Sequence, residues 1–251
     1  MDEESKQTKA QLEFKDDGRV EDSDLQMSED TEEYLTFVRR VLATLTAQVT
    51  LVFLFALIAT AGKSATKVFG TWPAFFVSIS VLIGSMMLLV QRKDWRTDVP
   101  KKYIAMTVWS LAMASLVAAF ASSINALGFV TLLMGASTAC GGLLLAAVYT
   151  NSRAQLEHHL KIGLLVALAM NLVVLLMMCY TMKFDMKALV VLTSLGMCAA
   201  TGFYVMFDLQ KVVMPELAHT GDYILGTLCI YLDISRLFYY TTTSAGSQTR
   251  S

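Results

Sequence analysis

The stretch Gly202–Tyr240, GFYVMFDLQKVVMPELAHTGDYILGTLCIYLDISRLFYY, carries the residues that decide the class of this protein. Two aspartates, Asp208 and Asp233, stand inside runs that are otherwise apolar enough to be membrane helices. A carboxylate at membrane depth is costly, so an aspartate rarely persists there without a role. The stretch therefore predicts two successive membrane helices, each with an acidic side chain that serves a function.

The spacing of the two aspartates predicts that they meet. Asp208 precedes the Pro215–Gly221 turn by about two helical turns, and Asp233 follows it by about three. At a rise of about 1.5 Å per residue, their depths in an antiparallel pair differ by well under ~10 Å. Two carboxylates close together at low dielectric constant cannot both ionise cheaply, so we expect them to share one proton. Loss of that proton would introduce repulsion and push the helices apart.

Ionised oxygens of Asp208 and Asp233 that face a wet cavity would also suit Ca²⁺, a hard cation that prefers oxygen ligands. Two carboxylates are too few for a tight site, so we expect transient binding and passage of Ca²⁺. The structural alternative is that each aspartate is held by a basic residue of its own helix. Lys211 follows Asp208 by three residues, and Arg236 follows Asp233 by three, which puts each pair on one helical face.

Three pieces of the stretch resemble the closing signature of the transmembrane Bax inhibitor motif (Bax-inhibitor/Lifeguard) family: Phe207–Gln210, Asp222–Ile224, and Leu228–Ile234 with Phe238. Weaker support comes from two other positions, Arg39-Arg40 before the first helix and Ala147-Val148-Tyr149 at the end of the fourth. The resemblance implies a seven-helix membrane protein whose paired aspartates form a pH-sensitive centre for calcium leak. It also implies protection against cell death through lowered store calcium.

Some members of that family place a basic residue in the second helix as a latch to the aspartate centre. The second apolar run, Phe69–Val90, contains no basic residue. Our hypothesis is that Arg236 takes the latch role from within the seventh helix, with Lys211 as a further candidate.

Composition independently indicates a membrane protein. Hydrophobic residues make up 55% of the chain and charged residues 16%, against about 25% charged in ordinary globular domains. We predict an all-α bundle of seven transmembrane helices over residues 35–240, with the less apolar seventh helix at its centre. The expected spans are Val41–Gly62, Phe69–Val90, Tyr103–Ala121, Ala126–Tyr149, Ile162–Thr181, Ala188–Met214 and Tyr223–Tyr240.

Charge is divided unevenly along the chain. Residues 1–33 carry thirteen acidic and four basic residues, whereas the remainder carries eight acidic and sixteen basic ones. We predict a disordered acidic tail over residues 1–34, which either only solvates the protein or binds membrane-protein partners, and a short polar tail over residues 241–251. Ten Lys and Arg residues fall on the N-terminal side of the spans and five on the other. This excess predicts a cytosolic N-terminus. The family resemblance further implies a multi-pass protein of the endoplasmic reticulum or another endomembrane.

Other chemistry finds little support in the sequence. Cys140, Cys179, Cys198 and Cys229 lie in apolar runs without metal-like spacing, so we expect them to pack. Adjacent histidines in Glu157-His158-His159 lack the spacing of a zinc helix. No hydrolase, nucleotide-binding or metalloprotease motif occurs. We therefore expect no enzymatic activity, no resident cofactor and no nucleic-acid partner.

Two functions of different classes remain open. The first is a pH-sensitive calcium leak channel of an intracellular membrane, with membrane lipid and Ca²⁺ as its partners. The second is a non-conducting interaction protein that regulates apoptosis or other channels. A retinal protein is disfavoured because the seventh span has no lysine, and an intramembrane aspartyl protease because no glycine-rich Asp motif accompanies the aspartates.

Overall fold

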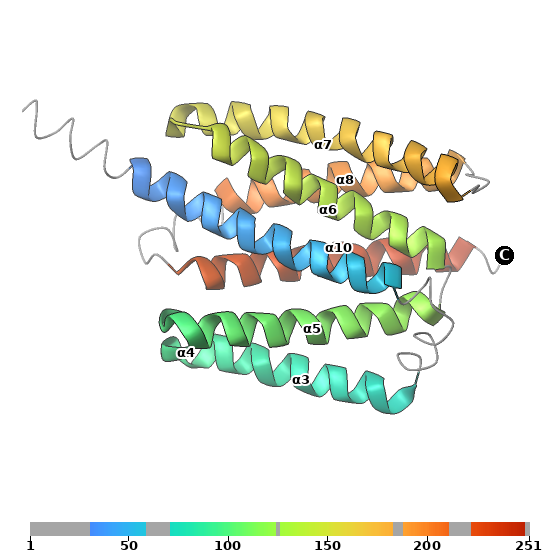
Figure 1. Ribbon diagram of the computed structural model, residues 1–251, viewed down its shortest axis with the longest axis horizontal. Coiled ribbons are helices and arrows are strands. Elements are labelled where there is room, and N and C mark those ends of the chain that lie inside the picture. Colours follow the sequence, from blue (N-terminus) through green and yellow to red (C-terminus); the bar gives the residue numbers. More distant parts are fainter. Residues whose placement is uncertain (1–30, 59–70, 124–125, 183–187, 211–221, 249–251) are drawn as a thin grey trace, which may run out of the picture.

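The computed structural model describes residues 31–58, 71–123, 126–182, 188–210 and 222–248, and these residues form helices without a strand. Figure 1 shows them as a bundle of long, roughly aligned helices. The bounds are Thr31–Ile58 for the N-terminal helix, Trp72–Gln91 (α3), Lys93–Thr97 (α4), Val99–Ser123 (α5), Ala126–Tyr149 (α6), Arg153–Met182 (α7), Ala188–Asp208 (α8) and Tyr223–Gln248 (α10). The predicted all-α class is confirmed.

The predicted count of seven spans is not confirmed. Six described helices contain a segment long and apolar enough to cross a membrane: Thr31–Ile58, Pro73–Gln91, Val99–Ala119, Val130–Tyr149, Arg153–Met177 and Val191–Asp208. Helix α10 is not among them, because it carries Asp233 and Arg236 and ends in the polar run TTTSAGSQ. Multiple apolar helices nonetheless make this an integral, multi-pass membrane protein.

Several helices extend further than the sequence indicates. The N-terminal helix is described from Thr31, not Val41, since Leu35, Phe37 and Val38 are buried in the core. Helix α10 continues past Tyr240 to Gln248. The prediction of a disordered tail falls mostly on residues 1–30, which lie outside the described residues.

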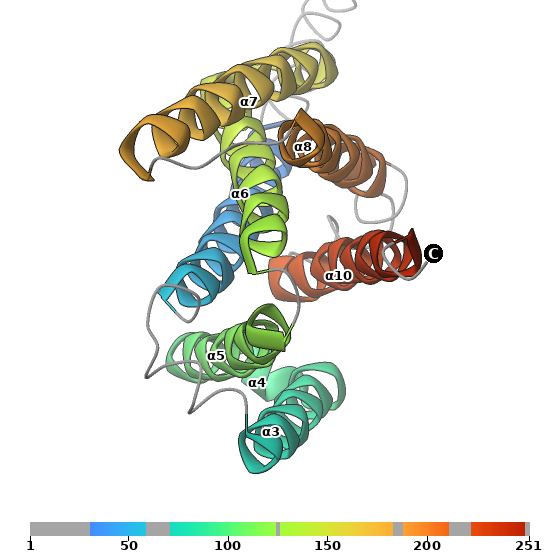
Figure 2. The same ribbon diagram turned by 90° about the vertical axis from the view of Figure 1, so that its right-hand side faces the viewer.

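Helix α10 packs between two other helices, α8 and α5 (Figure 2). Figure 2, which views the bundle end-on, shows α10 between α8 and α5, with α7 and α3 farther out. Its residues Ile224, Leu228 and Ile230 are almost fully buried. Trp109 of α5 meets the ring of Tyr231 edge-to-face, with centroids 4.7 Å apart. Helix α10, the least apolar of the long helices, is thus covered by protein on the sides that face α5 and α8 (Figure 2).

Small residues bring α6 close to α7 and α8, as the run around Gly135 and Gly142 predicts. A Cβ on Gly142 would lie 2.6 Å from the Cβ of Ala167 and from the carbonyl oxygen of Gly163. A Cβ on Gly135 would lie 2.5 Å from the carbonyl oxygen of Ser194. The backbones therefore approach so closely that glycine is required.

A buried hydrogen-bond network ties the same three helices together. The amide of Asn171 in α7 donates to the Ser194 carbonyl (3.3 Å) and to its hydroxyl oxygen (3.2 Å) in α8. The Ser194 hydroxyl donates to the Thr131 carbonyl in α6 at 2.8 Å. Side chains that hydrogen-bond between helices fix their register, and this network fixes the helix that ends at Asp208.

Candidate functional site: a contact between two aspartates

Asp208 is the last residue of α8 and is buried, with 6% of its surface exposed. Its neighbours Met206 and Leu209 are also buried. Its Oδ2 atom is enclosed and has no well-aligned hydrogen-bond partner among the described residues. A carboxylate oxygen in such a position has lost water without a full replacement, which is costly unless the group is protonated or meets a cation.

The structure brings Asp208 and Asp233 together. Their side chains lie in hydrogen-bonding contact, Asp208 at the end of α8 and Asp233 in the middle of α10. Two carboxyl groups can share a hydrogen bond only if one carries a proton, since an ionised carboxylate is an acceptor only. The juxtaposition expected from their spacing is therefore present, and their roles in ion passage and pH sensing remain predictions.

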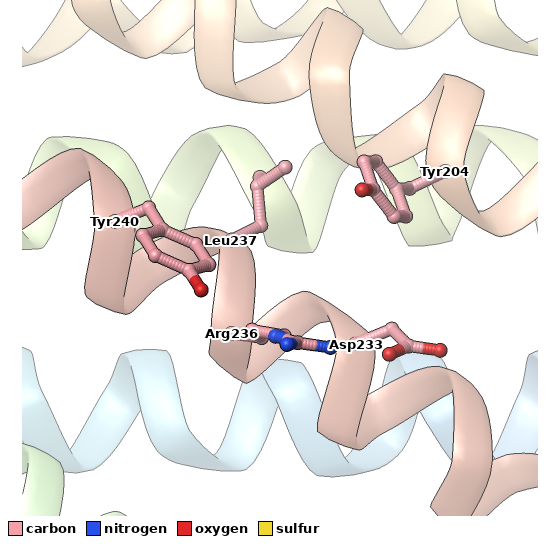
Figure 3. A pocket seen from close by; sticks show the side chains of 5 residues that line it. All are labelled: Tyr204, Asp233, Arg236, Leu237 and Tyr240. Carbon is pink, nitrogen blue, oxygen red and sulfur yellow. The ribbon is translucent and has the colours of Figure 1, made fainter.

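The two aspartates have unequal surroundings. Asp233 is half-buried and lines a cavity of about 280 Å³ together with Tyr204, Arg236, Leu237 and Tyr240. Figure 3 shows Tyr204 projecting from α8 and the other four side chains from α10. A polar cavity of this size has room for several water molecules. Asp208 is therefore enclosed by protein, while Asp233 borders a half-open cavity.

Arg236 shares the cavity with Asp233 but does not pair with it. The guanidinium is exposed, and no ion pair within the described residues joins it to Asp233. The structural alternative, in which Arg236 neutralises Asp233, is thus not what the described residues show. Lys211, the other candidate partner, lies outside the described residues.

Asp222, the residue immediately before α10, forms contacts that the sequence only partly indicates. Its Oδ1 accepts a hydrogen bond from the Leu225 backbone at 3.2 Å, as expected of an N-cap residue. Its Oδ2 lies 3.2 Å from Nε of Arg96 in α4, with both side chains largely buried at 18% and 15% exposure. The N–H is not aligned with Oδ2, so this contact is an ion pair.

Tyr223, the first residue of α10, lies close to two cations. Nζ of Lys102 is 5.0 Å from the ring centroid, and the guanidinium carbon of Arg40 is 6.0 Å from it. The Tyr223 hydroxyl also donates to the hydroxyl of Tyr103 at 3.5 Å. The start of α10 therefore rests on groups from the N-terminal helix and α5.

Arg39 and the segment Ala147-Val148-Tyr149, which were identified separately from the sequence, are in contact at the end of α6. Arg39 donates from Nε to the Ala147 carbonyl (3.1 Å) and from Nη2 to the carbonyls of Thr150 (2.7 Å) and Val148 (3.4 Å). A cation at a helix C-terminus satisfies unpaired carbonyls and interacts favourably with the helix dipole. Arg39 thus joins the N-terminal helix to α6.

The histidines next to this point form no metal site. Nδ1 of His159 lies 3.1 Å from the hydroxyl oxygen of Thr150, which itself donates to the Ala146 carbonyl at 2.7 Å. The Thr150 hydroxyl has one proton, so His159 is the donor in their contact. In the described parts of the chain, no group of three or more His, Cys, Asp or Glu side chains is placed to hold a metal ion.

The described cysteines sit among apolar neighbours. Cys140 and Cys198 are buried, Cys229 is half-buried, and none of the three forms a disulfide. The side chain of Cys179 lies outside the described residues. For Cys140 and Cys198, the predicted packing role agrees with their positions in the core.

Comparison with known proteins identifies a family. The family model described as "Inhibitor of apoptosis-promoting Bax1" matches residues 35–247, which is most of the chain. No match was found among curated proteins or among solved structures. The matched region contains both aspartates, Asp222 and Arg39, and the chain belongs to the Bax inhibitor family of membrane proteins.

Proposed function

We propose that this protein is a pH-sensitive calcium leak channel of an intracellular membrane, gated by the proton that Asp208 and Asp233 share. The observation that carries the proposal is the direct contact between the two carboxyl groups, one enclosed in the protein and the other beside a cavity. Membership of the Bax inhibitor family supports a role in calcium homeostasis and in the suppression of cell death.

Repulsion between the aspartates supplies the gating force. While one proton is shared, the carboxyl groups attract each other and hold α8 against α10. Once it is lost, two like charges about 4 Å apart repel by about 4 kcal/mol at an effective dielectric constant of 20. That energy corresponds to roughly a thousandfold change in the balance between two packings of the helices.

The cavity beside Asp233 also supports the proposal, because it has room for water ligands of Ca²⁺. Ca²⁺ takes about six to eight oxygen ligands. Two carboxylates supply at most four of these, and water in the cavity beside Asp233 would supply the rest. A site completed by water binds weakly, which suits passage. The proposal involves no catalytic reaction and no resident cofactor, with Ca²⁺ as the transported ion.

Arg236 is proposed as the latch of this centre. It lines the same cavity as Asp233 without an ion pair to it, so its guanidinium is placed to approach the aspartate once that side chain is ionised. An attraction formed only in the ionised state would favour loss of the shared proton.

The proposed membrane is the endoplasmic reticulum or another endomembrane, with the N-terminus in the cytosol. The excess of Lys and Arg at the end of the bundle where the N-terminal helix begins supports this orientation. Protease protection of an N-terminal tag in sealed microsomes tests it, and a protected tag would contradict it.

The direct test of conduction is calcium flux into liposomes that contain the purified protein, between about pH 6 and about pH 8. We expect flux that depends on pH in the wild type, and flux that is abolished or independent of pH in Asp233→Asn. Asp94→Asn, which changes an exposed carboxylate of α4, is the matched control. Absence of flux from folded protein would favour the alternative, a non-conducting interaction protein that regulates apoptosis or other channels.

A further inference from the structure

Cationic side chains gather at the end of the bundle where the N-terminal helix, α5, α7 and α10 begin. Figure 1 shows these four starts and the short α4 together at one end. We name five residues there the basic end: Arg40, Arg92, Lys93, Lys102 and Arg153. Four of them are exposed and Lys102 is half-buried. Within the described residues, none has a carboxylate at ion-pair distance.

Three other cations at this end are already paired with carboxylates. Arg96 pairs with Asp222, Lys101 with Asp98 at 2.6 Å, and Lys161 with Glu157 at 2.7 Å. Glu32, Glu33 and Asp94 are exposed and also lack an ion pair within the described residues. With Arg39, whose partners are backbone carbonyls, six described cations at this end without a carboxylate partner face three such anions, and the described surface has an excess of positive charge.

The positive charge is most concentrated around Tyr223. Arg40 and Lys102 both lie within 6.0 Å of the centre of its ring. The nearest carboxylate in sequence, Asp222, is occupied by Arg96 and by the backbone of Leu225. A group with negative charge near Tyr223 would be attracted by both Arg40 and Lys102.

An acidic segment of the same chain is attached within reach of these two cations. Residues 1–30 carry eleven acidic and four basic residues, and the segment Glu21–Asp24 (EDSD) has three carboxylates among four residues. Arg40 lies nine residues into the helix that begins at Thr31, which is about 14 Å along the axis. The seven residues from Asp24 to Thr31 span up to about 23 Å when extended.

We propose that the segment Glu21–Asp24 docks on Arg40 and Lys102. The match rests on opposite charge, on the short distance from the attachment point, and on the absence of a described counter-ion for either cation. Association of this kind is electrostatic and falls as salt screens the charges. The inference concerns contacts at this surface and does not depend on whether the protein conducts calcium.

Zero-length carbodiimide cross-linking of the full chain in nanodiscs of phosphatidylcholine tests the contact, because it joins a carboxylate to a nearby amine. We expect mass spectrometry to find Lys102 linked to Glu21, Asp22 or Asp24, at a yield several-fold above links from the segment to Lys161. Links between Lys101 and Asp98 and between Lys161 and Glu157, which are ion pairs in the structure, report that the chemistry works. The link to Lys102 should disappear near 1 M salt, where the screening length is about 3 Å.

Two variants of equal charge separate docking from general attraction. The triple change Glu21→Gln, Asp22→Asn, Asp24→Asn should leave less than about a third of tail links to Lys102, since general attraction in 0.15 M salt extends only about 8 Å. The change Asp2→Asn, Glu3→Gln, Glu4→Gln should leave the links to Lys102 unaltered. Equal loss in both variants would overturn the proposal.

A second measurement does not use Lys102 as the reactive group. Trypsin should cleave after Lys15 and Arg19 several-fold faster in Arg40→Gln/Lys102→Gln than in the wild type, because the docked segment is released. Arg92→Gln/Lys93→Gln, which removes the same charge elsewhere on the basic end, is the control. Unchanged cleavage in Arg40→Gln/Lys102→Gln would contradict the proposal.

Two other occupants of the basic end would show themselves in the same experiments. Links between isotopically labelled and unlabelled chains would mean that the acidic segment belongs to a second copy. No link in phosphatidylcholine nanodiscs, together with binding to phosphatidylserine vesicles that requires Arg40 and Lys102, would mean that an anionic lipid occupies the site. Either result overturns the proposal.

Discussion

Asp208 and Asp233 differ in what surrounds them. Asp208 is enclosed and Asp233 lines the cavity. In the proposed mechanism, a proton or cation that arrives from water would meet Asp233 first and would act on the packing of α8 through Asp208.

The proton shared by Asp208 and Asp233 predicts that the folding stability of the protein depends on pH. An unfolded chain loses the proton of each aspartate near about pH 4, whereas the folded pair keeps one proton to higher pH, so stability falls as pH rises between these two points and is constant above them. The melting temperature of the wild type should therefore fall as pH rises from about 4 and level off once the shared proton is lost. Asp208→Asn should lose this dependence, since one charge alone cannot repel. The same fall in Asp208→Asn would show that other groups cause it.

Arg236 predicts a change in the pH at which flux alters. An arginine that attracts the ionised Asp233 makes loss of the proton easier, so Arg236→Gln should move the midpoint of the flux curve to higher pH. The measurement is liposome calcium flux over a pH series. A midpoint that does not move would reject the latch role of Arg236.

At the scale of elements, α10 is held at its start by Asp222 in two ways. Asp222→Ala removes both the cap of α10 and the ion pair to Arg96, whereas Asp222→Asn keeps a good capping residue and removes only the charge. Loss of a cap costs about 1 kcal/mol. We expect Asp222→Ala to lower unfolding free energy by about that amount more than Asp222→Asn does, measured by denaturant titration in detergent. Equal effects would mean that the cap contributes nothing.

The contact of α6 with α7 gives a matched pair of glycine substitutions. A Cβ on Gly142 would collide with Ala167 and Gly163, whereas a Cβ on Gly141 would meet nothing within 4 Å. Overpacking costs about 1–3 kcal/mol, while alanine gains up to about 1 kcal/mol over glycine in a helix. We expect Gly142→Ala to lower the melting temperature and Gly141→Ala to leave it equal or higher. The opposite order would contradict the close helix approach.

Local patterns predicted some elements better than others. Apolar runs of about 20 residues located the cores of the helices, and the small residues around Gly135 and Gly142 indicated close packing. The helical residues 31–40 and the short helix Lys93–Thr97 were not predicted, because their polar or mixed sequence does not resemble a membrane span. Helix α10 exceeded its predicted end because its C-terminal turns are too polar to indicate a span.

At the scale of the whole molecule, the sequence predicted the contact between the two aspartates but not the long-range polar contacts that hold the surrounding helices. Asp208 and Asp233 were predicted to meet because a short connection and helix geometry relate their depths. The Arg96–Asp222 ion pair joins residues 126 positions apart, and no local pattern relates such residues. The same holds for Arg39 and the carbonyls at the end of α6. Long-range polar contacts follow from the assembled bundle.

Helix α10 connects the aspartate contact to the basic end of the bundle. Asp208 and Asp233 lie between α8 and α10, while the start of α10 rests on the N-terminal helix, α4 and α5. A displacement of α10 from α8 would therefore also alter the contacts of Asp222 and Tyr223. This connection predicts that changes at the basic end can influence the aspartate contact through α10.

Calcium flux through Asp233→Asn in liposomes, followed beside the wild type from about pH 6 to about pH 8, tests the central claim most directly. The shared-proton gate predicts that wild-type flux changes several-fold over this range and that the flux of Asp233→Asn is abolished or constant, while Asp94→Asn behaves as the wild type. A folded Asp233→Asn protein whose flux follows the wild-type pH curve would contradict it.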